Sequence, residues 1–157
     1  MQECCIDAAH SAEDLVVIGK LFEAYANSLP VDLGYQDFAA ELSGLPGKYA
    51  PPRGALLLAR GSDEKVHGCV GLRPLSDECG EMKRLYVLPS ARALGLGRAL
   101  AMAVIDTAKQ AGYREMRLDT LPSMTAAQAM YEQLGFKPIP PYYGPAPHGT
   151  VFMSCQL

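Results

Sequence analysis

The chain has 157 residues, 49% of them apolar, and a formal net charge of −3. This length and apolar content suit one domain with a substantial core, so we predict a single domain over residues 1–157. The small negative charge argues against a general attraction to nucleic acid, and no run of about 18 apolar residues suggests a membrane span. The first residues lack a secretion-signal pattern, so we expect a soluble cytoplasmic protein.

The first predicted elements are a strand over residues 3–8 and a helix that ends near Ser28. Ser11 and Asp14 have the spacing of a capping box at the start of this helix. Its apolar stripe consists of Leu15, Ile18, Phe22 and Tyr25. A second, short helix is predicted over Tyr35–Leu42.

Three strands follow, near residues 54–60, 65–73 and 79–88, and turn signals separate them. This spacing predicts an antiparallel meander. The last four elements alternate between helix and strand. A helix over Leu96–Ala111, which Gly112 ends, is followed by a strand over Met116–Asp119. A helix that Thr125 and Gln128 open as a capping pair and Gly135 ends is followed by a strand over about 150–156. The order predicts an α/β fold with a mixed central sheet and helices on both faces.

The five cysteines are odd in number and have no C-x-x-C spacing. We therefore predict reduced thiols, without a disulfide framework or a bound metal. His10, His67 and His148 lie in no pattern that would give a nucleophile its base.

A glycine turn between an apolar strand and a helix is the most informative stretch, and it runs from Arg92 to Arg98. The first amides of a helix have no partners within the helix, so together they bind an anion, usually phosphate. Gly95 and Gly97 allow the backbone to approach a diphosphate closely. Positive charge is concentrated nearby at Lys83, Arg84, Arg92 and Arg98. The alternative is that these glycines only make a turn.

Two known phosphate motifs do not fit this turn. A dinucleotide fingerprint needs a third glycine or alanine where this chain has Leu100, and no Gly-Lys-Ser/Thr string of a P-loop occurs. A third pattern, Arg/Gln-x-x-Gly-x-Gly/Ala, is met by Arg92, Gly95 and Gly97. In this pattern the chain resembles the GNAT superfamily of acyl-CoA-dependent N-acetyltransferases.

The resemblance implies that the turn, including Ala93, Leu94 and Leu96, holds the pyrophosphate of acetyl-CoA. It further implies that the strand residues Leu85, Tyr86 and Val87 run beside the pantetheine arm. Many relatives have an asparagine where this chain has Met124. Whether Ser123 or Thr125 replaces that contact stays open. The element order matches the GNAT fold along nearly the whole chain, while the motifs cover Glu81 to Phe136.

A second motif, Ala127 to Phe136, is similar to the family's Ala-x-x-x-Tyr-x-x-x-Gly-Phe block. The resemblance implies that the hydroxyl of Tyr131 lies near the sulfur of CoA. A phenol with a pKa near ~10 stays protonated at neutral pH, so Tyr131 is our candidate acid for the departing thiolate. The alternative is a core tyrosine, because Tyr131 also belongs to the apolar face of its helix.

Glu81 is the candidate base. It lies fourteen residues before Gly95, as does the catalytic glutamate in the histone-acetylating branch of the superfamily. The alternatives are a water relay or a solvated glutamate, whose pKa near ~4.3 would make it a weak base unless burial raised it.

Two proline-rich loops, residues 44–54 and 138–149, supply the candidate substrate contacts Tyr49, Arg53, Tyr142 and Tyr143. Arg53 would pair with a substrate carboxylate. The alternative is that the prolines only order long connections.

From the residues and the resemblance we predict an enzyme that moves an acetyl group from acetyl-CoA to a primary amine of a small molecule. The transfer is direct, within a ternary complex, and without a metal or a covalent acyl-enzyme. Two alternatives are a non-catalytic acyl-CoA-binding sensor or interaction module, and an acetyltransferase for protein lysines or N-termini. Relatives are often homodimers, so a homodimer is a further expectation.

Overall fold

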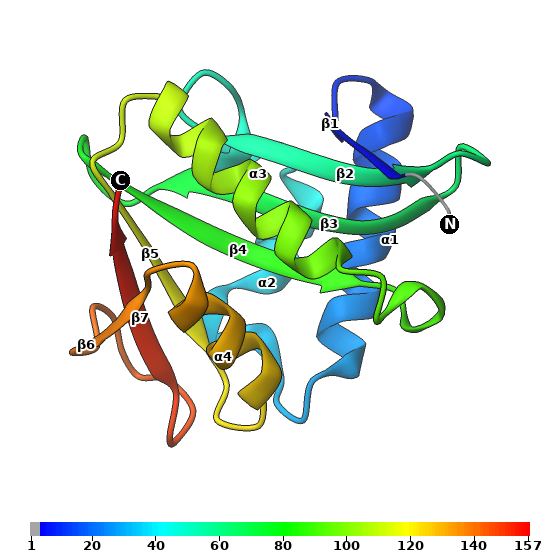
Figure 1. Ribbon diagram of the computed structural model, residues 1–157. Coiled ribbons are helices and arrows are strands. Elements are labelled where there is room, and N and C mark those ends of the chain that lie inside the picture. The colour runs from blue at the N-terminus through cyan, green and yellow to red at the C-terminus, as the bar shows by residue number, and fades with distance from the viewer. Residues whose placement is uncertain (1–3) are drawn as a thin grey trace.

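The computed structural model describes residues 4–157 and contains one seven-stranded sheet between two helical layers. Figure 1 shows α3 and α4 in front of the sheet and α1 and α2 behind it. The strands are β1 (Cys4–Ala8), β2 (Ala55–Gly61), β3 (Val66–Pro74), β4 (Cys79–Val87), β5 (Glu115–Thr120), β6 (Lys137–Ile139) and β7 (Val151–Gln156). The helices are α1 (Ala12–Ser28), α2 (Phe38–Ser43), α3 (Leu96–Gln110) and α4 (Thr125–Gln133).

The sheet is mixed, with the strand order β1-β2-β3-β4-β5-β7-β6. Strands β1 to β4 pair antiparallel, which confirms the predicted meander. Strands β4 and β5 pair parallel, and β7 pairs antiparallel with both β5 and β6. Helices cover both faces, so the predicted α/β architecture is confirmed.

Each face of the sheet has its own apolar core. Leu56 and Leu58 of β2 pack behind the sheet with Phe22 of α1. The alternate residue Leu57 packs in front with Val104 of α3. A strand covered on both faces reads as a continuous apolar run, and the buried stretch of β2 is such a run.

Local signals set most of the boundaries. The predicted capping box of α1 is present, because the Ser11 hydroxyl accepts from the amide of Asp14 and the Asp14 carboxylate accepts from the amide of Ser11. Gly112 follows α3 with a φ of +92°, a conformation that other residues rarely adopt. The predicted strand over residues 3–8 begins at β1, and its residue 3 lies outside the described part of the chain.

Three local expectations were wrong. Thr125 and Gln128 do not form the predicted capping pair of α4. The N-cap residue is Met124, whose side chain makes no capping hydrogen bond, and the side-chain amide of Gln128 donates to the carbonyl of Leu121. The short helix predicted over Tyr35–Leu42 is divided into a 3₁₀ turn and α2, because Asp37 between them has a φ of +56°. The second proline-rich loop begins with the short strand β6, since backbone pairing with β7 outweighs its loop-like composition.

Candidate functional site: a groove and an inner cavity

The glycine turn opens α3 with its first amides free of side-chain caps. Gly95 precedes the helix with a φ of +77°, and no side chain of residues 4–157 caps the helix N-terminus. A Cβ on Gly95 would meet nothing within 4 Å, so this glycine is required for its backbone conformation and not for lack of space. Amides that converge in this way at a helix start can bind a phosphate group.

A groove of about 630 Å³ leads away from this turn. It runs between the end of β4 and the start of α4, and Tyr25 and Ser28 of α1 line it as well. The residues predicted to hold the cofactor that line it are Leu85, Tyr86, Val87, Arg92, Ala93, Gly95, Leu96, Gly97, Arg98 and Ser123. Leu94 does not line it, and its side chain is 59% exposed. Thr125 lines the groove beside Ser123, so the structure leaves both able to replace the family's asparagine contact.

Two exposed arginines flank the turn. The Arg92 Nε donates to the carbonyl of Val87 at 3.2 Å, and its guanidinium lies 5.8 Å from the ring centre of Tyr86. The Arg98 Nη1 donates to the side-chain oxygen of Gln133 at 3.0 Å. Neither arginine forms an ion pair with a carboxylate of residues 4–157, so both keep their charge available to a bound anion.

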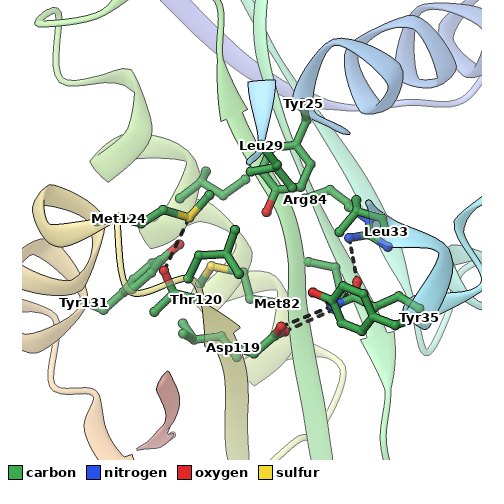
Figure 2. A pocket seen from close by; sticks show the side chains of 16 residues that line it. Tyr25, Leu29, Leu33, Tyr35, Met82, Arg84, Asp119, Thr120, Met124 and Tyr131 are labelled. Atoms are coloured by element: carbon green, nitrogen blue, oxygen red, sulfur yellow. Dashed lines mark hydrogen bonds and ion pairs between the residues drawn. The ribbon is translucent and has the colours of Figure 1, made fainter. Parts of the chain in front are cut away.

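The groove continues into a smaller inner cavity, because β4 and β5 diverge. They pair only at Cys79–Glu81 and Glu115–Arg117, although both strands extend beyond these residues. Arg84 has a φ of +59°, which breaks the regular alternation of β4 inside the diverging part. The cavity between the strands has a volume of about 80 Å³ and is shown in Figure 2. Tyr25, Leu85, Met124 and Ala127 line both the groove and the cavity, so these residues mark their junction.

Tyr131 of α4 lines the inner cavity, and its side chain belongs to the core as well. It is 7% exposed and packs edge-on against Phe136, with ring centres 5.7 Å apart. Burial raises the pKa of its hydroxyl, so the group stays protonated at neutral pH. The hydroxyl forms no hydrogen bond to any group of residues 4–157. It is therefore a free proton donor at the cavity.

Glu81 is not brought to this cavity. Its side chain is 1% exposed, and it lines neither the groove nor the inner cavity. One carboxylate oxygen accepts from the Arg73 Nε at 2.8 Å, and the other accepts from the Tyr142 hydroxyl at 2.6 Å. The alternative of a solvated glutamate is wrong. The spacing between Glu81 and Gly95 placed Glu81 on its strand. It could not show that Arg73 and Tyr142 bind the Glu81 carboxylate, because Tyr142 lies far away in the sequence.

The cavity contains a carboxylate and a lysine that the sequence did not single out as a pair. The Lys83 Nζ lies 3.1 Å from Asp119 Oδ1 and 3.1 Å from Gln36 Oε1. Burial alone would raise the pKa of Asp119, but Lys83 and a hydrogen bond from Tyr143 outweigh it and hold that pKa below its usual range. Burial lowers the pKa of Lys83, although Asp119 opposes the shift. Asp119 thus stays ionised at neutral pH.

A second buried pair lies beside the first. The Arg84 Nε and Nη2 each donate at 3.0 Å to the carboxylate of Glu41, and Nη1 donates at 2.7 Å to Gln36 Oε1. Lys83 and Arg84 were expected near the phosphate turn, and this expectation was wrong because both point into the buried network. The signal that could have shown it is two adjacent cations in a strand with an otherwise buried pattern.

Of the predicted substrate contacts, Tyr143 lies nearest to the cavity. Its hydroxyl donates at 2.7 Å to Asp119, which lines the cavity. Tyr142 is engaged with Glu81, and its ring packs 5.5 Å from that of Tyr143. The hydroxyl of Tyr49 donates to Glu41 at 3.1 Å, and the Tyr49 side chain is buried beside a different hollow.

Arg53 lies at the opposite end of α3 from the glycine turn. Its guanidinium donates to the carbonyls of Ala111 and Asp77, at 3.1 and 2.6 Å, and lies 4.1 Å from the ring centre of Tyr113. A helix of this length separates its two ends by about 20 Å. Arg53 therefore joins a loop to the end of α3 and is not brought to the groove.

Within residues 4–157 no group of three or more histidine, cysteine or acidic side chains could hold a metal ion. None of the helices in the same range is long and apolar enough to cross a membrane. All five thiols are free, and burial raises the pKa of Cys69 to about 12.

Comparison with known proteins gives the same family in each case. The family model "Acetyltransferase (GNAT) family" matches residues 20–136. An uncharacterized N-acetyltransferase of Schizosaccharomyces pombe is 37% identical over 154 residues, which cover 97% of this chain and 94% of the relative. The structure of a GNAT-family acetyltransferase from Staphylococcus aureus superposes with a TM-score of 0.79 at 22% identity, covering 98% and 99% of the two chains. A GNAT-family acetyltransferase from Elizabethkingia anophelis with acetyl-CoA bound gives a TM-score of 0.66 at 21% identity, covering 98% of each chain.

Proposed function

This chain belongs to the GNAT family of acyl-CoA-dependent acetyltransferases, and from that premise we propose that it transfers the acetyl group of acetyl-CoA to a primary amine of a small molecule. One observation carries the proposal. The groove that starts at the uncapped turn of α3 leads directly to the cavity in which the hydroxyl of Tyr131 has no partner among residues 4–157.

The donor follows the groove in this proposal. Its diphosphate binds the first amides of α3, with Arg92 and Arg98 beside it. Its pantetheine arm lies along Leu85 to Val87, where β4 has no β5 neighbour to pair with. The thioester then reaches the junction between groove and cavity. The fold is that of a neighbour whose structure contains acetyl-CoA, which supports acetyl-CoA as the donor.

The proposed reaction is a direct transfer. The nitrogen of the acceptor attacks the thioester carbonyl carbon, the carbon–sulfur bond breaks, and the thiolate takes the proton of the Tyr131 hydroxyl. Asp119 is the carboxylate that lines the cavity, and its low pKa suits it to hold and orient the acceptor amine. Since Glu81 lies outside the cavity, we propose that water takes the amine proton away and that a proton from water restores the hydroxyl of Tyr131.

The small size of the inner cavity favours a small acceptor. A volume of about 80 Å³ accommodates an amine with only a few more atoms inside the diverging strands. A protein lysine could still present its ammonium there, so the acceptor panel has to include peptides.

The test is thiol release from acetyl-CoA against amines, amino acids, polyamines, aminoglycosides and short peptides, together with calorimetric binding of acetyl-CoA. Turnover with a small amine supports the proposal, and turnover with peptides alone would replace it with protein acetylation. Tight binding of acetyl-CoA without any turnover would favour a sensor. A failure to bind acetyl-CoA would contradict the placement of the donor at the turn.

A further inference from the structure

A second tyrosine faces the inner cavity from the opposite helical layer. Tyr25 lies on α1, behind the sheet, whereas Tyr131 lies on α4, in front of it. Figure 2 shows their two side chains approaching the cavity from opposite sides. In the sequence, Tyr25 only extends the apolar stripe of its helix.

The position of Tyr25 differs from that of Tyr131 in one informative respect. Tyr25 lines both the groove and the inner cavity, whereas Tyr131 lines the cavity alone. The other residues at the junction are Leu85, Met124 and Ala127, and none of these side chains carries a hydroxyl. The thioester placed at the junction by the proposed function would therefore meet the hydroxyl of Tyr25.

The hydroxyl of Tyr25 is also chemically prepared to donate. Burial raises its pKa to about 12, so it keeps its proton through the neutral range. It forms no hydrogen bond to a group of residues 4–157. The ring is held by edge-on packing against Tyr86, with ring centres 5.9 Å apart. The hydroxyl is thus fixed and protonated, and the described part of the chain leaves it free to donate to a bound ligand.

We propose that Tyr25 donates a hydrogen bond to the carbonyl oxygen of the bound thioester and stabilises the negative charge that this oxygen gains during transfer. This inference rests on the proposed function. As the amine nitrogen bonds to the carbonyl carbon, the carbonyl π electrons move to oxygen, and they return when the carbon–sulfur bond breaks. Tyr25 keeps its proton throughout, while Tyr131 supplies the proton that the thiolate takes. Two tyrosines from the two helical layers thus serve the two atoms that become anionic.

The test compares Tyr25→Phe with the wild type, because phenylalanine keeps the ring and removes only the hydroxyl. We expect kcat and kcat/KM to fall together by about 10²-fold, the usual loss for one donor to such an oxygen, with little change in the affinity for acetyl-CoA. A second readout needs no acceptor. In the infrared spectrum of bound acetyl-CoA labelled with ¹³C at the thioester carbonyl, the carbonyl stretch should move to higher wavenumber in the variant.

Tyr113→Phe is the matched control, because Tyr113 is buried and its hydroxyl donates to the carbonyl of Arg53, away from the groove and cavity. It should leave the carbonyl stretch where the wild type has it. An unchanged stretch in Tyr25→Phe, or a kcat within about twofold of wild type, would overturn the inference. A rise in the KM of the acceptor alone would overturn it too and place Tyr25 at the acceptor. A wild type that neither binds nor turns over acetyl-CoA would instead refute the proposed function.

Discussion

The groove and the buried charged network differ in how far their polar groups are already paired. The network consists of Gln36, Glu41, Lys83, Arg84 and Asp119 with the residues bonded to them. The groove presents groups that have no partner among residues 4–157: the first amides of α3, two arginines without carboxylates, and the hydroxyl of Tyr25 at the junction. The hydroxyl of Tyr131, in the cavity beyond the junction, has no partner in the same range either. In the network nearly every polar group is already satisfied, as Gln36 shows by bonding Lys83, Arg84 and Asp119 at once. Unpaired groups are available to a ligand, whereas most of the paired charges hold a shape. Asp119 is the member of the network that lines the cavity and to which the proposed function also gives the acceptor amine.

This contrast predicts that changes in the network affect folding most, and that changes in the groove affect binding and turnover. The largest effect is expected for Glu41→Ala. It leaves the guanidinium of Arg84 buried without its carboxylate, and the two side chains are only 9% and 2% exposed. Removing one partner of such a pair destabilises a protein by about 3–5 kcal/mol, which chemical denaturation measures.

The control is Glu78→Ala, which breaks an exposed pair with Arg114. We expect no measurable change in the free energy of unfolding, because water solvates both charges of this pair. If the two variants lost the same free energy of unfolding, the burial of the Arg84–Glu41 pair would not give the network a special role in stability.

The next largest effect concerns turnover. Tyr131→Phe should lower kcat by about 10²-fold, equivalent to about 2.7 kcal/mol of transition-state stabilisation, while the affinity for acetyl-CoA and the stability change little. Steady-state kinetics and calorimetry measure the two quantities. A normal kcat would remove Tyr131 from the mechanism and leave it as a core residue.

A smaller effect, on the free energy of unfolding, should differ between the two glycines of the turn. Gly95→Ala forces alanine into a left-handed conformation and should cost about 1–2 kcal/mol of stability. Gly97→Ala should cost none, since Gly97 lies inside α3, where alanine is favoured. Thermal and chemical unfolding of both variants provide the comparison. Equal destabilisation would show that the backbone conformation of Gly95 is not the reason for a glycine there.

The smallest effect is expected at the rim of the groove. Arg98→Ala should weaken acetyl-CoA binding by no more than about fivefold, because exposed charge pairs contribute roughly 0.2–1 kcal/mol. The loss should shrink further as salt is added. Calorimetric titrations at two salt concentrations measure it, with Arg114→Ala as an exposed control on another part of the surface. An effect that salt does not change would point to packing in place of charge.

The same division explains what the sequence could predict. The glycine turn and the Tyr131 block are contiguous motifs, so a short stretch of chain places its own residues, and the expected fold is confirmed. The network joins residues far apart in the chain: Lys83 and Asp119 are 36 positions apart, and Tyr142 and Glu81 are 61 apart. Tertiary packing alone brings such partners together. For this reason Glu81 was located on its strand but its surroundings were not foreseen.

The direction of the strands decides at which edge of the sheet the groove and the starts of α3 and α4 lie. Among residues 4–157, β4 and β5 are the one adjacent parallel pair, so the chain leaves both strands at the same edge of the sheet. Each strand is followed by a helix, and α3 and α4 therefore both begin at that edge, with no side chain capping either one. Had β5 run the other way, the two helix starts would lie at opposite edges. The connectivity of the chain, before any single side chain, thus selects the edge at which a ligand can find two sets of unpaired amides.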